Sequence, residues 1–122
     1  MDAAEQHLLQ DFTDGVETLK REIGYNPTYL MGMVAEHGPA EASRRLIRSK
    51  DASDGFTRLW EASRPDMTVE AIALLPWYEE LFDDRDRELA RRRLDAYRFD
   101  VDGFLARMTQ SPPSWWHGRT GS

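Results

Sequence analysis

The chain has 122 residues, enough to bury one hydrophobic core without cross-links. Its formal net charge of -6 disfavours nucleic-acid backbones and anionic membranes as partners, except where basic residues gather locally. Cysteine is absent, which excludes disulfides and thiolate metal sites and fits a reducing compartment. No stretch approaches the ~20 apolar residues of a membrane span, and the N-terminus is acidic where a signal peptide is basic. We therefore expect a cytoplasmic protein without membrane contact.

The first element predicted is a long amphipathic helix over residues 3–23. Apolar residues recur there at steps of three and four, which places them on one stripe of a helix. The residues of this stripe are Leu8, Phe12, Val16, Leu19 and Ile23. Gly24 is expected to end the helix.

Two shorter helices are predicted next. Asn26 is expected to be the N-cap of the first and Pro27 its first residue, and Gly38 is expected to end it. Pro39 then begins the second helix. The side chains expected to point inward are Tyr29, Leu30, Met33 and Val34 in the first helix and Leu46 and Ile47 in the second.

A central helical hairpin is predicted over residues 53–75. Phe56, Leu59 and Trp60 form the apolar face of its first helix, and we expect Trp60 to be largely buried. The break at residues 64–66 separates the helices, and Thr68 is the expected N-cap of the second. That second helix has an apolar face of Val69, Ile72 and Leu75.

The remaining helices complete an all-α prediction. Pro76 starts a short turn with apolar Trp77, Leu81 and Phe82. Asp83 and Asp84 cap the next helix, whose inward residues are Leu89, Ala90, Leu94 and Tyr97. A last helix over residues 101–108 presents Val101, Phe104, Leu105 and Met108. We predict a compact bundle of about six to seven short helices, with residues 1–108 as one helical domain and residues 109–122 as a tail.

The tail has an unusual composition for a chain end. Prolines, serines and glycines oppose helix formation, yet Trp115 and Trp116 are adjacent and His117 follows them. Three interpretations remain open: the tryptophans dock on the bundle, the tail is a recognition segment for a partner, or it is a substrate for modification. Residues Trp115, Trp116 and His117 are candidate binding or modification residues in the last two cases.

No catalytic or metal-binding constellation is predicted. His7 and Asp11 have the helical spacing of two metal ligands, but such a pair is more often part of a solvated face. The acidic stretch of residues 79–88 lacks the alternating ligands and central glycine of a Ca²⁺ loop. No nucleophile elbow or phosphate-binding glycine loop is present. We therefore expect no enzyme activity, no metal and no cofactor.

Basic residues gather in two places, at Arg44, Arg45, Arg48 and Lys50 and again at residues 91–93. Residues 29–48 form a helix, a glycine turn and a second helix that carries arginines, an order that resembles a DNA-binding helix-turn-helix. In that motif the second helix would present Glu41, Ser43, Arg44 and Arg48 to DNA. The proline after Gly38, the acidic total charge and Arg44 at a normally aliphatic position argue against it. A helical hairpin with a basic outer face is the preferred interpretation.

The quoted elements also carry a family resemblance. The patterns YNPTYLMGMVAEHG, AEASRRLI, SDGFTRLWEASRPDMTVEAIALLP and RELARRRLDAY resemble those of a family of small stand-alone all-helical bacterial proteins. The resemblance covers residues 12–97 and implies the helical fold, but no activity, cofactor or catalytic residue. It also implies that residues 98–122 are an addition to the shared part.

Three functions remain open from the sequence. The favoured one is a non-catalytic module that binds a protein partner through the basic face of Arg44, Arg45 and Arg48 or through the tail. The second is a precursor whose helical part is recognised by a maturation enzyme that modifies the Trp-rich tail. The third is a nucleic-acid-associated protein. The sequence does not determine the oligomeric state.

Overall fold

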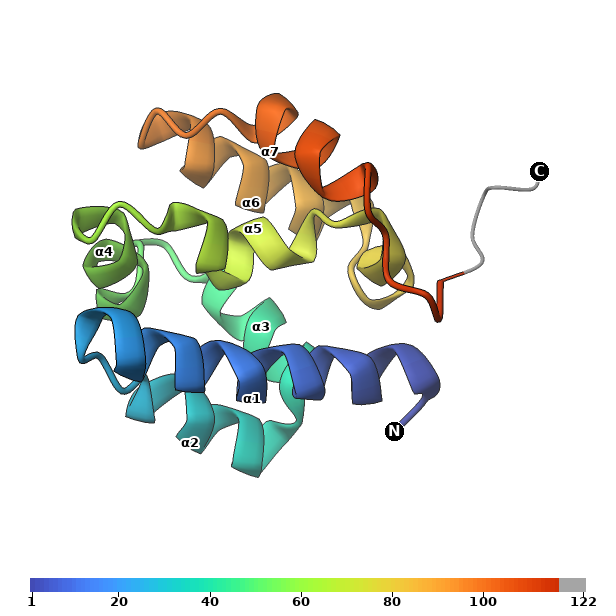
Figure 1. Ribbon diagram of the computed structural model, residues 1–122, viewed down its shortest axis with the longest axis horizontal. Coiled ribbons are helices and arrows are strands. Elements are labelled where there is room, and N and C mark those ends of the chain that lie inside the picture. The colour runs from blue at the N-terminus through green and yellow to red at the C-terminus, as the bar shows by residue number, and fades with distance from the viewer. Residues whose placement is uncertain (117–122) are drawn as a thin grey trace.

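A computed structural model describes residues 1–116 of the chain, and this part is all-helical, as predicted (Figure 1). It contains seven α-helices, two 3-10 segments and, within residues 1–116, no strand. The α-helices are α1 (Ala3–Ile23), α2 (Thr28–His37), α3 (Pro39–Arg48), α4 (Asp54–Glu61), α5 (Val69–Ala73), α6 (Asp84–Ala96) and α7 (Val101–Thr109). The 3-10 segments are η1 (Pro65–Met67) and η2 (Pro76–Leu81).

Helix α1 runs along one side of the bundle and has the bounds that the sequence predicts. The Asp2 carboxylate accepts a 2.8 Å hydrogen bond from the backbone N–H of Glu5, which caps the N-terminus. Gly24 ends the helix at φ 64°, a left-handed conformation that glycine adopts without steric cost. Leu8, Phe12 and Leu19 are buried, so the predicted stripe faces the core.

Helices α2 and α3 form the predicted hairpin, with two corrections. Helix α2 begins at Thr28, and the prediction of Asn26 as its N-cap is wrong, because no side chain caps this end. Tyr29 was expected to point inward but is 72% exposed, since α2 lies at the edge of the bundle and buries only Val34. Gly38 joins the two helices at φ 85°, and Pro39 begins α3 as predicted.

The central hairpin has the predicted cap at Thr68 but not the predicted position of Trp60. Ser53 caps α4, and Thr68 caps α5 by accepting a 3.2 Å hydrogen bond from the N–H of Ala71. Trp60 is 44% exposed. Its indole N–H needs an acceptor and finds one on the surface, the carbonyl of Tyr97 at the end of α6, at 3.2 Å.

The second half of the chain wraps around α5. Asp83 and Asp86 form a reciprocal capping box at the start of α6, and Asp100 caps α7. Buried side chains on this half, most of them predicted, are Trp77, Leu81, Phe82, Ala90, Leu94, Val101 and Phe104. Met108 was expected to point inward but is 38% exposed, because it lies at the open end of α7.

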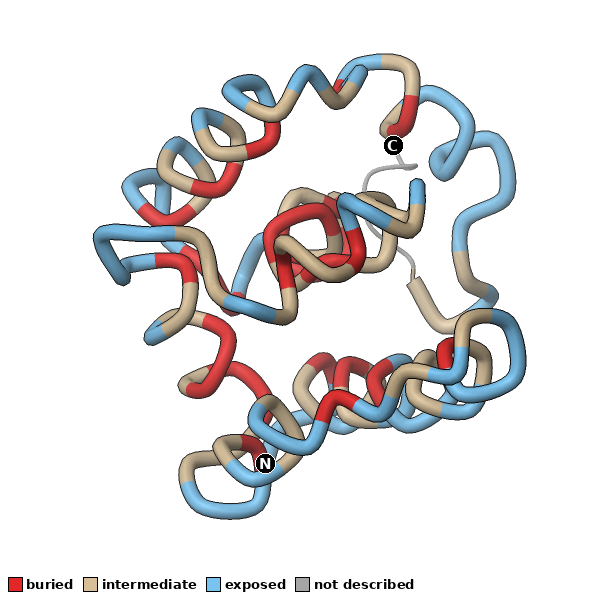
Figure 2. Tube along the Cα trace, turned by 90° about the vertical axis from the view of Figure 1, so that its left-hand side faces the viewer, coloured by how far each residue is buried: buried red, intermediate tan, exposed pale blue. Residues whose placement is uncertain are grey.

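The core lies between α1, α3, the α5–η2 segment, α6 and α7. Figure 2 shows buried positions on the inner sides of the helices and exposed positions on the outer sides. Within residues 1–116, no helix is long and apolar enough to cross a membrane.

Candidate functional site

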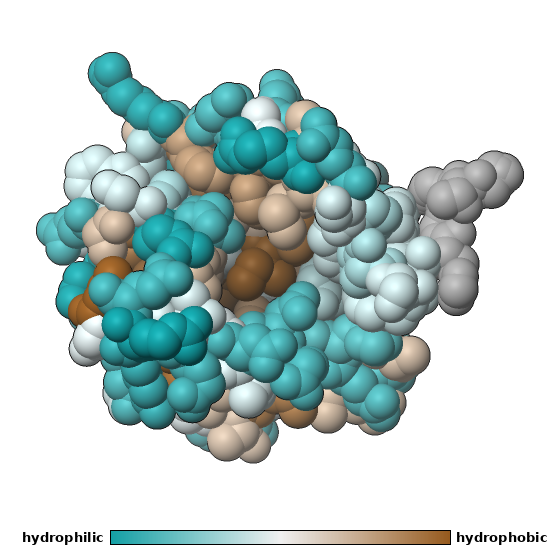
Figure 3. Space-filling view, in the orientation of Figure 1, coloured by the Kyte–Doolittle hydropathy of each residue, from teal (hydrophilic) through white to brown (hydrophobic). Residues whose placement is uncertain are grey.

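The described part of the molecule contains an apolar cavity of about 710 Å³. It opens on the face that Figure 3 shows, between α1 and α5, and residues of α2, α3, α4 and α7 complete its walls. Figure 3 shows hydrophobic residues deep in this opening and hydrophilic residues around its rim. A volume of this size lies within the ~300–1,000 Å³ range of protein ligand sites.

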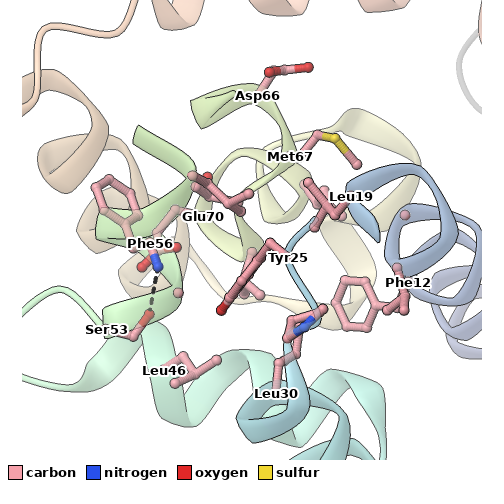
Figure 4. A pocket seen from close by; sticks show the side chains of 18 of the residues that line it. Phe12, Leu19, Tyr25, Leu30, Leu46, Ser53, Phe56, Asp66, Met67 and Glu70 are labelled. Carbon is pink, nitrogen blue, oxygen red and sulfur yellow. Dashed lines mark hydrogen bonds between the residues drawn. The ribbon is translucent and has the colours of Figure 1, made fainter. Parts of the chain in front are cut away.

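The walls are built by the apolar stripes that the helices direct inward. Those labelled in Figure 4 are Phe12, Leu19, Leu30, Leu46, Phe56 and Met67. Tyr25, in the connection between α1 and α2, lies in the middle of this view. The Arg58 guanidinium lies 5.5 Å from the centre of the Tyr25 ring, a cation–π distance that holds the ring in place. Tyr25 therefore contributes a polar hydroxyl to the lining of the cavity.

Four carboxylates line the cavity, and none of the described lining residues is a lysine, arginine or histidine. The carboxylates belong to Asp11, Asp54, Asp66 and Glu70. Asp66 is held by Arg64, whose Nε and Nη2 atoms donate 3.2 Å hydrogen bonds to its two oxygens. Asp54 is exposed and has no ion-pair partner within residues 1–116.

Glu70 is the most buried of these carboxylates, at 2% exposed. Arg93 of α6 donates to it from Nη1 at 2.7 Å. Burial raises the pKa of Glu70, and the hydrogen bond from Arg93 opposes that rise. Arg93 also donates to the carbonyls of Leu46 and Ser49, at 3.1 and 2.6 Å. The pair thus ties α5, α6 and the end of α3 together behind the cavity.

Asp11 is fixed by a different partner. The Tyr78 hydroxyl donates a hydrogen bond to its carboxylate, joining α1 to η2. Burial raises the pKa of Asp11, and the Tyr78 hydrogen bond partly opposes this. Burial and the neighbouring Asp11 charge both raise the pKa of Tyr78. Tyr78 therefore acts here as a neutral hydrogen-bond donor.

The basic residues singled out from the sequence have intramolecular partners. Arg44 and Arg45 donate to the Glu41 carboxylate at 3.1 and 3.0 Å. Arg48 makes a bidentate pair with the buried Asp86, at 2.6 and 3.0 Å. Ser43, which a helix-turn-helix would present to DNA, is fully buried. The outer face of α3 is therefore less positive than its sequence indicates.

The described part of the tail lies against α1 and η2. The Trp115 ring stacks on His7 with centroids 4.0 Å apart and planes 2° apart. Trp116 packs edge-on against the buried Trp77 at 5.5 Å. Both tail tryptophans are half-buried. His117, the third predicted tail residue, lies outside the described residues.

Among residues 1–116, no three His, Asp or Glu side chains gather closely enough to hold a metal ion. His7 and Asp11 do share a face of α1, but His7 stacks on Trp115 and Asp11 accepts from Tyr78. Both side chains are thus engaged in contacts within the protein, a ring stack for His7 and a hydrogen bond for Asp11.

Sequence reasoning missed the cavity and the partners that hold Glu70 and Asp11. The sequence did contain a signal that Glu70 is buried. Glu70 is the one charged residue in the apolar run of residues 69–78, and side chains in such a run are expected to be buried. Tyr78 and Asp11 are 67 residues apart, and no local pattern connects them.

Comparison of the chain with family models, with curated proteins and with solved structures found no match. The resemblance to a family of small helical bacterial proteins therefore stays a prediction.

Proposed function

We propose that this protein is a non-catalytic binding module, and that the apolar cavity receives an apolar segment of a partner protein. The observation that carries the proposal is that two large apolar residues of the cavity lining are exposed. Tyr29 and Met108 both line the cavity and are 72% and 38% exposed. Large exposed apolar groups beside an open apolar hollow are typical of protein-binding surfaces.

The rim favours a protein segment over a small molecule. A small ligand inside the cavity leaves the Tyr29 ring and the Met108 thioether in water. A segment that crosses the mouth and inserts one or two side chains covers both. This is the arrangement in which an amphipathic helix places its apolar face in a groove.

The charges around the cavity favour a segment with lysine or arginine beside its apolar residues. Asp66 and Glu70 are neutralised by Arg64 and Arg93, but Asp54 has no ion-pair partner within residues 1–116. Asp11 accepts only a neutral hydroxyl, from Tyr78. A cation on the partner compensates these charges, whereas a carboxylate there is repelled.

The polar groups of the cavity support a binding role over a catalytic one. The Ser53 hydroxyl caps α4, and the Thr68 hydroxyl caps α5 while donating to the Pro65 carbonyl. These hydroxyls are used for structure and are not paired with a general base.

Selection of short displayed peptides on the purified protein tests the proposal. We expect selected peptides to be apolar with basic residues and to lose about tenfold or more in affinity on Tyr29→Ser or Met108→Ser. Trp60→Ser and Met1→Ser are matched controls, since both residues are exposed and neither lines the cavity. They should leave the affinity unchanged.

Two results contradict the proposal. Peptide binding that is insensitive to both rim variants places the binding surface elsewhere. Tight binding of the neutral dye Nile red, insensitive to both rim variants and without any peptide selected, indicates a small-molecule site in the cavity instead.

A further inference from the structure

A second hollow, here called the cationic hollow, lies where the end of α3 meets α6. It has a volume of about 360 Å³ and is lined by Arg48, Ser49, Lys50, Arg85, Leu89, Arg92 and Arg93. Five of these seven residues are cationic, and no carboxylate lines it. Two basic clusters that are far apart in the sequence are thus brought to one place by the packing of α3 on α6.

Two of the guanidinium groups are held in fixed positions. Arg48 donates two hydrogen bonds to Asp86, and Arg93 donates three, to Glu70, Leu46 and Ser49. A guanidinium has five N–H donors, so both groups keep unused donors. Fixed donors lose little entropy when they bind an anion.

The other three cations are poorly compensated. Arg85 and Arg92 share the single carboxylate of Glu88, at 3.6 and 2.7 Å. Lys50 is exposed and has no ion-pair partner within residues 1–116. The backbone carbonyls at the end of α3 add partial negative charge to the hollow. Those of Leu46 and Ser49, however, already accept hydrogen bonds from Arg93. Positive charge therefore exceeds negative charge in the hollow.

The surroundings limit the size of the anion. Asp83 lies 3.9 Å from Arg48 and is exposed, and Asp84 beside it is almost fully exposed. A long polyanion that follows the surface beyond the hollow meets these carboxylates and is repelled. A compact anion that stays inside is not.

We propose that the cationic hollow binds a phosphoryl group, either of a small phosphate compound or of a phosphorylated side chain. Several oxygens with charge near -2 match several convergent guanidinium and ammonium donors. This site is separate from the proposed partner-binding cavity and does not depend on it.

Calorimetric titration at low salt tests the proposal with inorganic pyrophosphate, a phosphoserine peptide, the same peptide unphosphorylated and a single-stranded oligonucleotide. We expect a phosphoryl probe to bind and Lys50→Gln or Arg92→Gln to weaken it about tenfold, as the loss of a charged hydrogen bond does. Arg45→Gln is the control, because it removes one exposed positive charge outside the hollow. It should change the affinity little. Both test residues are exposed, and thermal unfolding checks that the variants stay folded.

Comparison of the titrated probes identifies the source of the phosphoryl group. Pyrophosphate binding alone supports a small phosphate compound, and preference for the phosphorylated over the plain peptide supports a phosphorylated protein. Absence of binding by both phosphoryl probes overturns the proposal. Equal weakening by Arg45→Gln, or tighter binding of the oligonucleotide than of either phosphoryl probe, also overturns it, since bulk charge or a polyanion is then the cause.

Discussion

Arg93 and Glu70 form a 2.7 Å ion pair that separates the apolar cavity from the cationic hollow. Glu70 lines the cavity and Arg93 lines the hollow, with side chains 3% and 11% exposed. The same arginine also binds two carbonyls at the end of α3. One buried side chain therefore fixes the relative positions of α3, α5 and α6, on which both proposed sites depend.

Removal of Arg93 is expected to be strongly destabilising. Arg93→Met leaves Glu70 and two carbonyls without their donor, and loss of one partner of a buried pair costs about 3–5 kcal/mol. Urea denaturation gives the free energy of unfolding. The double variant Glu70→Leu/Arg93→Met should recover part of the loss, because it leaves no buried carboxylate unpaired. A single variant as stable as the parent would falsify this account of the pair.

The Asp11 carboxylate should make stability fall as pH rises. Burial raises its pKa above the ordinary 3.8, so the folded protein holds this proton more tightly than the unfolded chain does. The contribution to the free energy of unfolding is complete below pH 3.8 and is lost as pH rises through the folded-state pKa.

Asp11→Asn removes this titration while keeping an oxygen to accept from Tyr78. The free energy of unfolding of the variant is measured by denaturation at a series of pH values. Above pH 3.8 it should fall less steeply with rising pH than that of the parent protein does. Parallel profiles for the parent and Asp11→Asn contradict the assignment.

Trp60→Ala should cost much less than truncation of a core aromatic. Trp60 is 44% exposed and loses one hydrogen bond to Tyr97 and an edge contact with its ring at 5.3 Å. We expect about 1–2 kcal/mol, against about 3–5 kcal/mol for Phe56→Ala, whose ring is 2% exposed. Denaturant midpoints measured side by side decide this. Equal losses in the two variants would mean that Trp60 belongs to the core.

The Trp60 and Tyr29 errors show where sequence reasoning stops. Helical spacing correctly placed Phe12, Phe56 and Leu94 in the core, since period and apolarity are local properties of the chain. The same spacing cannot say which of two adjacent large residues faces a neighbouring helix. That depends on acceptors such as the Tyr97 carbonyl, 37 residues away.

The candidate sites depend on long-range contacts still more. The arginines of α3 were visible in the sequence as a basic face. Glu41 pairs with Arg44 and Arg45 within the same helix, but the pair of Arg48 with Asp86 requires the packing of α3 on α6. Asp83 caps α6 as predicted, whereas Asp84, the other predicted cap, is the first residue of the helix. Asp86 completes the capping box and belongs to the acidic stretch that was interpreted as solvated, yet it is fully buried beneath Arg48. Local signals gave the cap correctly and carried no information about the partner.

Gly55 and Tyr25 should be energetically coupled across the cavity wall. A Cβ atom at Gly55 would lie 3.2 Å from the Tyr25 hydroxyl, which is closer than ordinary contact. Gly55→Ala gains about 0.5–1 kcal/mol of helix propensity in α4, but the added methyl displaces Tyr25. In a Tyr25→Phe background the crowding is relieved and the same substitution should stabilise.

Urea denaturation of four proteins completes this double-mutant cycle: the parent, each single variant and the double variant. We expect Gly55→Ala to be more favourable in the Tyr25→Phe protein than in the parent, by about 0.5 kcal/mol or more. An identical effect in both backgrounds shows that Tyr25 does not pack on α4 as described.

The last prediction concerns the tail, whose Trp115 ring lies flat on His7 at 4.0 Å. Stacked aromatic rings contribute about 0.5–1.5 kcal/mol beyond their buried area. His7→Ala and Trp115→Ala should therefore be non-additive by about this amount in urea denaturation, because either change alone removes the contact. Trp116→Ala with His7→Ala is the control pair, since Trp116 packs on Trp77 instead. Coupling in the first pair alone means that a partner or a modifying enzyme must first displace Trp115 from α1. Strict additivity in both pairs means that the tail is held too weakly to oppose such a partner, and the interpretation as a recognition or substrate segment then gains support over that as a structural strap.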